Sequence, residues 1–264
     1  MKKKYWLVFK NSFQDAIVYR FDTISALFAH LFSFAAFFYL WHSIYRQDEQ
    51  IGSYTLGSLI SYYLVTNLLN LIIKNEDIAW IISDEIRLGE ISNIILKPLN
   101  YTWFVFARAL GKASFSAITY TLAMTLIFYA LGNRLETPKS FSVLVFFIFF
   151  AITGFFISFF VKYLVGLCSF WFGMIWGFNF TFSLVASFLD GSFVPLDLIP
   201  EPFSTIVNIL PFKYIIFIPI SIFTNRMEPS LHMFIIPLLW IILFYLMTRF
   251  VLQRGLKKYE GYGI

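Results

Sequence analysis

The chain has 264 residues, of which 59% are hydrophobic and only 13% are charged. Its mean hydropathy is +0.74, whereas a soluble domain carries about 25% charged residues. This composition excludes an ordinary soluble domain and, with its long apolar runs, predicts an all-α integral membrane protein. The net charge of +5 is explained by membrane topology, so we expect no nucleic-acid partner. Cys168 is the only cysteine, which excludes a disulfide framework or a cysteine metal site within one chain.

The first 21 residues predict an amphipathic helix. Trp6, Phe9, Phe13 and Ile17 recur at helical spacing, and polar residues occupy the other faces. We expect residues 1–21 to form an interfacial helix on the cytoplasmic membrane surface. The alternative is a short soluble helix that packs on a partner.

Six apolar runs are long enough to cross a membrane as helices, for which about 20 residues are needed. They cover residues 24–45, 54–73, 103–131, 141–160, 163–188 and 231–250. The third run is overlong, so its first turns, with Arg108 and Lys112, are expected to emerge into the headgroups. Lys162 nearly alone separates the fourth and fifth runs, which predicts a tight turn there.

The basic residues set the orientation. With six spans, one side receives five of the 20 Lys and Arg residues, namely Arg46, Arg134, Lys139, Lys213 and Arg226, and the other side receives the remaining fifteen. Because Lys and Arg accumulate in cytoplasmic loops, both termini are predicted to be cytoplasmic and the segment between spans five and six external.

The longest cytoplasmic connection, residues 75–100, predicts a second amphipathic helix. Ser83 is expected to cap this helix and Pro98 to end it. Its isoleucines give one apolar face, at Ile86, Ile91, Ile94 and Ile95. Such a helix could rest on the membrane or dock into a groove on a soluble partner, and the residues leave both alternatives open.

Residues 190–223 form an apolar segment broken by proline. Five of the chain's nine prolines lie here, at positions 195, 200, 202, 211 and 219. Segments 203–210 and 213–223 are too short to span, so an external re-entrant hairpin is expected. Interrupted backbone at membrane depth is tolerated only where protein or a water-filled cavity covers it, which favours a transport function.

Two further sets of residues are candidates for a pathway or a helix seam. Ser169, Gly173 and Gly177 recur at every fourth position, a spacing that lets helix backbones approach closely, within one bundle or between subunits. On the second run, Asn67 and Asn70 share a face with Tyr63 and Lys74. These side chains either hydrogen-bond neighbouring helices or line a cavity. His30, deep in the first run, is interpreted as a hydrogen-bonded packing residue.

The chain carries no recognisable energy source or catalytic group of its own. It contains no phosphate-binding loop and no zinc or serine-hydrolase motif. Every Asp and Glu is predicted to lie in a loop or flank, whereas ion-coupled carriers place carboxylates inside their spans. We therefore expect no catalytic residue, no metal and no bound cofactor, and energy supplied by another chain.

Two motifs resemble the ABC-2 type permeases, the membrane subunits of ATP-binding cassette exporters. One is Gly191-Ser-Phe-x-Pro195-Leu-x-x-Ile-Pro200 with Leu210-Pro-Phe-x-Tyr214 and Pro219. The other is Glu85-Ile-x-x-Gly89-Glu-Ile-Ser-Asn93 with Leu96-Lys-Pro98, which is similar to the paired-permease branch. The layout matches over nearly the whole chain. The resemblance implies ATPase coupling through Asp84, Glu85, Arg87, Gly89, Glu90, Lys97 and Pro98, and an external gate shaped by Gly191, Phe193, Pro195, Pro200, Pro211 and Tyr214.

The resemblance also implies partners. They are two copies of a cytoplasmic ABC ATPase that bind ATP and Mg²⁺, a second permease chain in a homodimer or heterodimer, and the lipid of a bacterial plasma membrane. Asp197 and Glu201 make the hairpin unusually acidic and are expected to face water. The alternatives are a gated channel, an ion-coupled carrier and, with less support, a membrane-embedded enzyme that modifies lipid.

Overall fold

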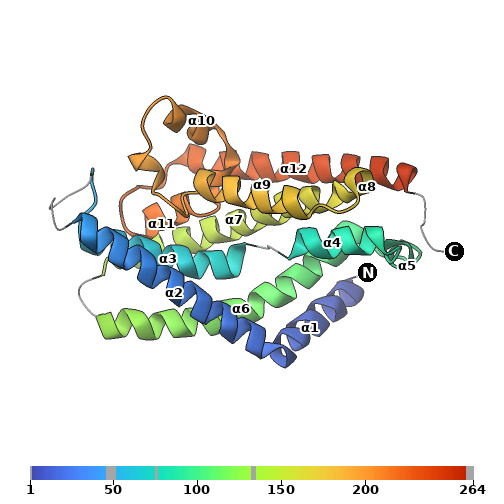
Figure 1. Cartoon of the computed structure of the whole chain (residues 1–264), viewed down its shortest axis with the longest axis horizontal. Helices are drawn as coiled ribbons and strands as arrows, with labels where there is room; N and C mark the ends of the chain where they lie inside the picture. Colours follow the sequence, from blue (N-terminus) through green and yellow to red (C-terminus); the bar gives the residue numbers. More distant parts are fainter. Residues whose placement is uncertain (1, 46–51, 75–76, 132–134, 260–264) are drawn as a thin grey trace.

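The computed structural model describes residues 2–45, 52–74, 77–131 and 135–259, and all regular structure in these ranges is helical, without a β-strand. The long helices run along one axis of an elongated bundle, and both chain ends lie at the same end of it (Figure 1). Two residues of the charge count, Arg46 and Arg134, lie outside the described residues. A chain that crosses a membrane an even number of times has both ends on the same side, and the position of the two chain ends is consistent with this.

The N-terminal segment folds as two helices, α1 (Lys2–Val18) and α2 (Arg20–Ile44), with a break at Tyr19. α1 packs along α6 (Tyr101–Leu131). A Cβ atom added at Gly111 would lie 2.4 Å from the backbone oxygen of Phe9, so glycine permits this close approach. The predicted helix is therefore present, and it packs on its own chain.

The second span and the connection after it divide into three helices, α3 (Leu56–Ile73), α4 (Ile78–Arg87) and α5 (Ile91–Ile95). Thr55 and Ser58 form a reciprocal capping box at the start of α3. The prediction that Ser83 caps a helix is wrong, because Ser83 is buried inside α4. α4 begins before Ser83 because the apolar periodicity already begins at Ile78. Gly89, with φ +83°, separates α4 from α5.

The predicted turn at Lys162 is also wrong. α7 (Phe141–Leu167) runs through this position without interruption. A single lysine breaks no backbone hydrogen bond, and its aliphatic stem packs well in an apolar setting. The chain instead turns after Leu167, through the short α8 (Ser169–Phe172) and Gly173, whose φ is +66°.

The fifth predicted span, 163–188, is consequently not one helix, since only α9 (Trp176–Leu189) runs back along the bundle. The stripe of small residues does not form one face, because Ser169 belongs to α8, Gly173 is the break and Gly177 belongs to α9. A Cβ atom at Gly173 or Gly177 would meet no heavy atom within 4 Å. Neither glycine marks a close helix contact within this chain.

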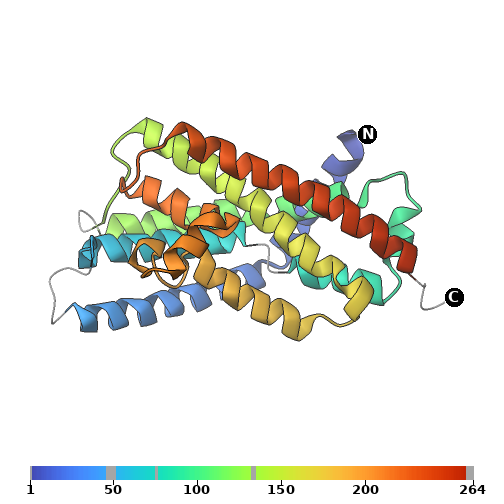
Figure 2. The same ribbon diagram turned by 90° about the horizontal axis from the view of Figure 1, so that it is seen from above.

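The proline-rich segment forms a series of short helices between α9 and α12 (Leu231–Lys258). They are η2 (Leu196–Leu198), α10 (Phe203–Ile209), η3 (Pro211–Tyr214) and α11 (Phe217–Phe223). Their bounds agree with the expected short segments. Seen from above, this hairpin lies beside α9 in the half of the bundle away from the chain ends (Figure 2).

Four candidates among the described helices are long and apolar enough to cross a membrane, namely α2, α3 taken together with α4, α7 taken together with α8, and α12. α6 has 31 residues and α9 has 14. At 1.5 Å per residue, α9 extends only about 21 Å, less than the about 30 Å of a bilayer core. The core lies where α3, α7 and α11 meet, with Tyr62, Phe159 and Ile220 fully buried.

Candidate functional site

The polar face of α3 lines a cavity of about 270 Å³ in the interior of the bundle. α2 closes one side of it, and the end of α9 and the start of the hairpin close another. The predicted shared face is present, since Tyr63, Asn67, Asn70 and Lys74 all line the cavity. The other lining residues are His30, Ser33, Phe37, Thr66, Ser187, Ser192 and Phe193.

Hydrogen bonds hold the cavity wall in place. Nδ1 of His30 lies 3.1 Å from Oδ1 of Asn67, which makes His30 a hydrogen-bonded packing residue as interpreted. The Asn67 amide donates to the backbone oxygen of Tyr63 at 2.7 Å. The Ser192 hydroxyl donates to Oδ1 of Asn70 at 3.2 Å. Asn67 thus connects α3 to α2, and Asn70 connects α3 to the hairpin.

A buried ion pair lies at the inner end of this cavity. Nζ of Lys74 is 3.0 Å from Oδ2 of Asp190, and their side chains are 14% and 2% exposed. Lys74 also donates to the Ser187 hydroxyl at 2.8 Å, and Asp190 accepts from the backbone N–H of Ser192 at 2.8 Å. Asp190 follows the last residue of α9 and so lies in a flank, as expected, but it is buried because the apolar helix α9 ends inside the protein.

A second lysine extends the polar interior towards α7. Lys162 is 5% exposed, and its ammonium donates to the Ser183 hydroxyl on α9. Lys74, Lys162 and Asp190 all line one small cavity of about 20 Å³. Polar groups therefore continue from α3 across α9 to α7. The sequence signal was Lys162 itself, which was assigned to a turn.

Three tyrosines of the α3 region fasten the hairpin. The hydroxyl of Tyr62 donates to the backbone oxygen of Gly191 at 2.6 Å, and that of Tyr63 donates to the oxygen of Phe193 at 2.7 Å. Tyr54 donates to Oδ1 of Asp197 at 3.0 Å. Sequence reasoning missed Tyr54 and Tyr62, although a buried tyrosine in an apolar run generally needs a hydrogen-bond partner.

The predicted hairpin residues occupy different environments. Gly191 has φ +88°, and a Cβ atom there would lie 2.8 Å from the Tyr62 hydroxyl oxygen. Phe193 packs on Phe188, with 4.7 Å between ring centroids. The remaining predicted positions divide into buried Pro195, Pro211 and Tyr214 and exposed Pro200.

The two acidic side chains of the hairpin are exposed, as expected, and Asp197 also accepts the bond from Tyr54. The hydroxyls of Ser204 and Thr205 hydrogen-bond Glu201 and lower the pKa of its carboxyl.

At the end of the bundle near the chain termini, Glu85 faces inward. Its side chain accepts a hydrogen bond from the Tyr101 hydroxyl and forms an ion pair with Arg108, whose Nη1 lies 2.8 Å from Oε1. Only 6% of Glu85 is exposed. Glu85 therefore fastens α4 to α6 and lies beneath the surface that a partner could reach.

The surface of α4 and α5 is formed by other residues of the predicted set. Asp84 and Arg87 are exposed and form an ion pair at 3.0 Å. Between and after the two helices, Leu88 is 57% and Leu96 is 85% exposed. We call this region the α4–α5 surface; its other predicted members are partly exposed Gly89 and exposed Glu90, Lys97 and Pro98.

The fold and the site define a class: a helical membrane protein with a polar cavity in its interior and exposed apolar side chains at one end. A model of the family described as ABC-2 family transporter protein matches residues 31–263 of the chain. The chain belongs to this family. It is therefore a transporter permease of the membrane, and the family in general works with an ABC ATPase. Neither the curated proteins nor the solved structures contain a match to the chain.

Proposed function

We propose that the chain is the transmembrane subunit of an ABC exporter, and that ATP hydrolysis on a separate subunit drives it. The observation that carries this proposal is the short distance in sequence between the α4–α5 surface and the polar cavity. α4 begins four residues after Lys74, which lines the cavity and pairs with Asp190. A movement of α4 would therefore be passed to the cavity wall through few residues.

Under this proposal the chain crosses the membrane six times. The crossings are α2, α3, α6, α7, α9 and α12, α4 and α5 lie on the cytoplasmic side, and both termini face the cytoplasm of a bacterial cell. Since α9 alone is short for a bilayer, the hairpin would fill the external half of the fifth crossing. Lys162 moves from a loop into α7, which leaves fourteen Lys and Arg on the cytoplasmic side against five on the other, and this distribution still agrees with the arrangement.

Coupling would begin at the α4–α5 surface. Two copies of the ATPase, each with ATP and Mg²⁺, would contact Leu88, Leu96 and the charged residues between them. An apolar side chain that is 85% exposed, as Leu96 is, gains most from burial against a partner. Glu85, with Arg108 and Tyr101, would transmit the movement of α4 to α6.

The pathway would form where two permease chains meet. The cavity is lined by α2, α3 and α9, and apolar side chains on α2 and α9 are exposed. A second copy or a related permease would cover them. The hairpin would close the external side, and its release would require that its tyrosine hydrogen bonds and the Lys74–Asp190 pair rearrange.

The proposal is tested by co-purification with the ABC ATPase whose gene neighbours that of the permease. The permease is tagged and co-expressed with this ATPase, and the double variant Leu88→Asp/Leu96→Asp is compared with Ile209→Asp. Ile209 is 69% exposed on α10, a helix in the half of the bundle away from α4 and α5 (Figure 1), so it controls for an added surface charge.

We expect the unmodified chain and the Ile209 variant to retain the ATPase, and the double variant to lose most of it. Retention by the double variant would place the contact elsewhere. A chain that retains no ATPase at all would contradict the exporter and favour a gated channel.

A further inference from the structure

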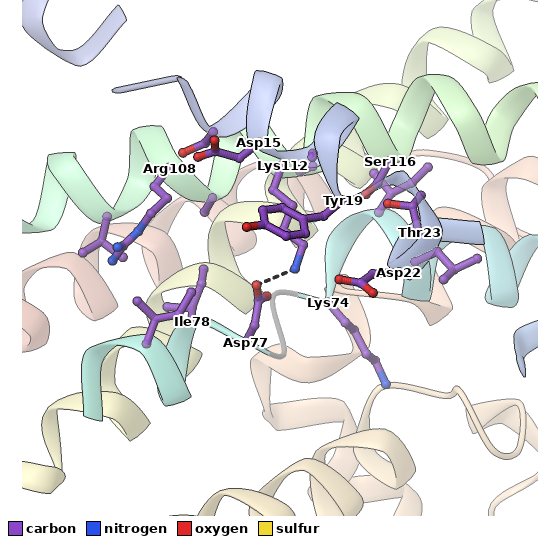
Figure 3. A pocket seen from close by; sticks show the side chains of 18 residues that line it. Asp15, Tyr19, Asp22, Thr23, Lys74, Asp77, Ile78, Arg108, Lys112 and Ser116 are labelled. Carbon is purple, nitrogen blue, oxygen red and sulfur yellow. Dashed lines mark hydrogen bonds and ion pairs between the residues drawn. The ribbon is translucent and has the colours of Figure 1, made fainter. Parts of the chain in front are cut away.

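A second cavity, of about 310 Å³, lies between α1, α2, α4, α6 and the end of α3, and it shares only Lys74 with the polar cavity described above. Its wall combines apolar side chains with charges of both signs from separate segments (Figure 3). The charged and aromatic groups used below are Asp15, Tyr19, Asp22, Asp77, Arg108 and Lys112. We propose that this cavity binds the headgroup of a phospholipid that carries both a phosphate and an ammonium group.

The position of the cavity fits a lipid headgroup. Asp22 immediately precedes the first apolar run, Asp77 follows the second, and Arg108 and Lys112 belong to the first turns of the third. Charged side chains at the ends of three apolar runs that meet in one cavity mark the edge of the hydrocarbon layer. The Tyr120 hydroxyl donates to the backbone oxygen of Thr23 at 3.0 Å, which fastens α2 to α6 at this level.

The α6 wall provides the groups for a phosphate. Arg108 uses Nη1 for Glu85, whereas its Nη2 is buried and has no hydrogen-bond partner among the described residues. Lys112 lies one helical turn further on the same side of α6 and donates to Asp77 at 2.6 Å. A lysine ammonium has three donors, so it can bind a second anion. A phosphate oxygen would satisfy the unused donor of Arg108.

The junction of α1 and α2 provides the groups for an ammonium. Asp15 and Asp22 are both exposed and make no ion pair or side-chain hydrogen bond in the described chain. Tyr19, at the break between the helices, places its ring between the two sides of the cavity (Figure 3). Carboxylates beside an aromatic ring are suited to an ammonium group.

The helices that line the cavity also carry exposed apolar side chains on their other faces, at Phe21 and Ile24 on α2 and at Ile118 and Leu122 on α6. The acyl chains of a lipid whose headgroup fills the cavity would lie against the apolar surface of these helices. A soluble molecule with the same headgroup would not use this surface, so the two sources can be distinguished by experiment.

The test measures binding to the purified full-length chain in detergent. The probes are dihexanoyl phosphatidylethanolamine, dihexanoyl phosphatidylglycerol, which lacks the ammonium, and soluble phosphoethanolamine. We expect the ethanolamine lipid to bind most tightly. The double variant Asp15→Asn/Asp22→Asn should lose about fivefold in affinity for it and little for the glycerol lipid, as expected for exposed charge pairs. Both aspartates are exposed and unpartnered, so these variants should fold.

Glu228→Gln is the control, since Glu228 is an exposed acid in the segment between α11 and α12 and its loss should leave all affinities unchanged. Equal binding of the two lipids to the unmodified chain would overturn the proposal. An unchanged preference in the aspartate variant would also overturn it. If phosphoethanolamine binds as tightly as the lipid, the assignment to a membrane lipid is overturned.

Discussion

Nζ of Lys74 lies 3.0 Å from Oδ2 of Asp190, and this pair joins the segment between α3 and α4 to the point where α9 ends and the hairpin begins. Two buried opposite charges stabilise each other only while both are present, because each would otherwise be left desolvated and uncompensated. Lys74 also lines the polar cavity, and both members of the pair line the smaller cavity of about 20 Å³ that lies towards α7. The ion pair therefore holds one wall residue of the proposed pathway in place.

The first prediction concerns this pair. Asp190→Asn or Lys74→Met alone should lower the free energy of unfolding by about 3–5 kcal/mol, because either leaves one buried charge without its partner. The double variant Lys74→Met/Asp190→Asn should lose less than either single variant. The measurement is denaturant or thermal unfolding of the purified chain in one detergent.

The matched control is the exposed pair of Asp84 and Arg87, also 3.0 Å apart. Asp84→Asn should change stability by at most about 1 kcal/mol. A cost of Asp190→Asn as small as that of Asp84→Asn would show that the buried pair is well solvated.

The second prediction concerns the start of the hairpin. Gly191→Ala should cost about 1–3 kcal/mol, because alanine is strained at φ +88° and its Cβ would lie 2.8 Å from the Tyr62 oxygen and 3.0 Å from Cβ of Phe217. Gly177→Ala is the control. Gly177 lies within α9 and has open space around it, so alanine should be neutral or stabilise the helix by up to about 1 kcal/mol. Equal stabilities for the two variants would contradict the hairpin geometry.

The long apolar runs and their approximate ends could be predicted from the sequence, since 20 or more apolar residues allow few alternatives. The short segments of the hairpin were also predictable, because proline limits where a helix can continue. The error at Lys162 has a physical cause: charge was used as the signal for a turn. The backbone is interrupted at Gly173, where glycine allows a positive φ. A buried lysine can lie within an intact helix if a neighbouring hydroxyl accepts a hydrogen bond from its ammonium group, as Ser183 does from Lys162.

The candidate site was less predictable. The polar face of α3 was recognisable from spacing, yet the sequence alone could not show that it lines a cavity. Asp190 and Glu85 were placed at accessible positions because acidic residues usually are. Which acids are buried depends on contacts between residues far apart in the chain, as between Glu85 and Arg108, and helical periodicity carries no information on them.

The third prediction compares a buried carboxylate, Glu85, with an exposed one, Glu90, in the region of α4 and α5. Glu85→Gln should lower stability by about 1–3 kcal/mol, since it leaves Arg108 without its carboxylate. Glu90→Gln should stay within about 0.5 kcal/mol of the unmodified chain, because Glu90 is exposed. Unfolding of the two variants in the same detergent is the measurement. If Glu85→Gln is neutral, α4 is not fastened to α6 through this carboxylate.

The last prediction concerns water in the polar cavity. Replacement of the single cysteine, Cys168→Ser, gives a background without thiols, and serine can keep the bond that the thiol donates to the backbone oxygen of Leu164. In this background Asn70→Cys should react with a charged, membrane-impermeant thiol reagent about tenfold faster than Leu59→Cys, because only a hydrated thiol ionises readily. Asn70 lines the cavity, whereas Leu59 is 1% exposed in the core.

The same two variants also test coupling to the ATPase. Addition of ATP to the complex with its ATPase should change the reaction rate at Asn70→Cys and leave the rate at Leu59→Cys unchanged. Equal, slow reaction rates at both positions would mean that the cavity is closed to water. If ATP does not change the rate at Asn70→Cys, ATP hydrolysis does not alter the cavity.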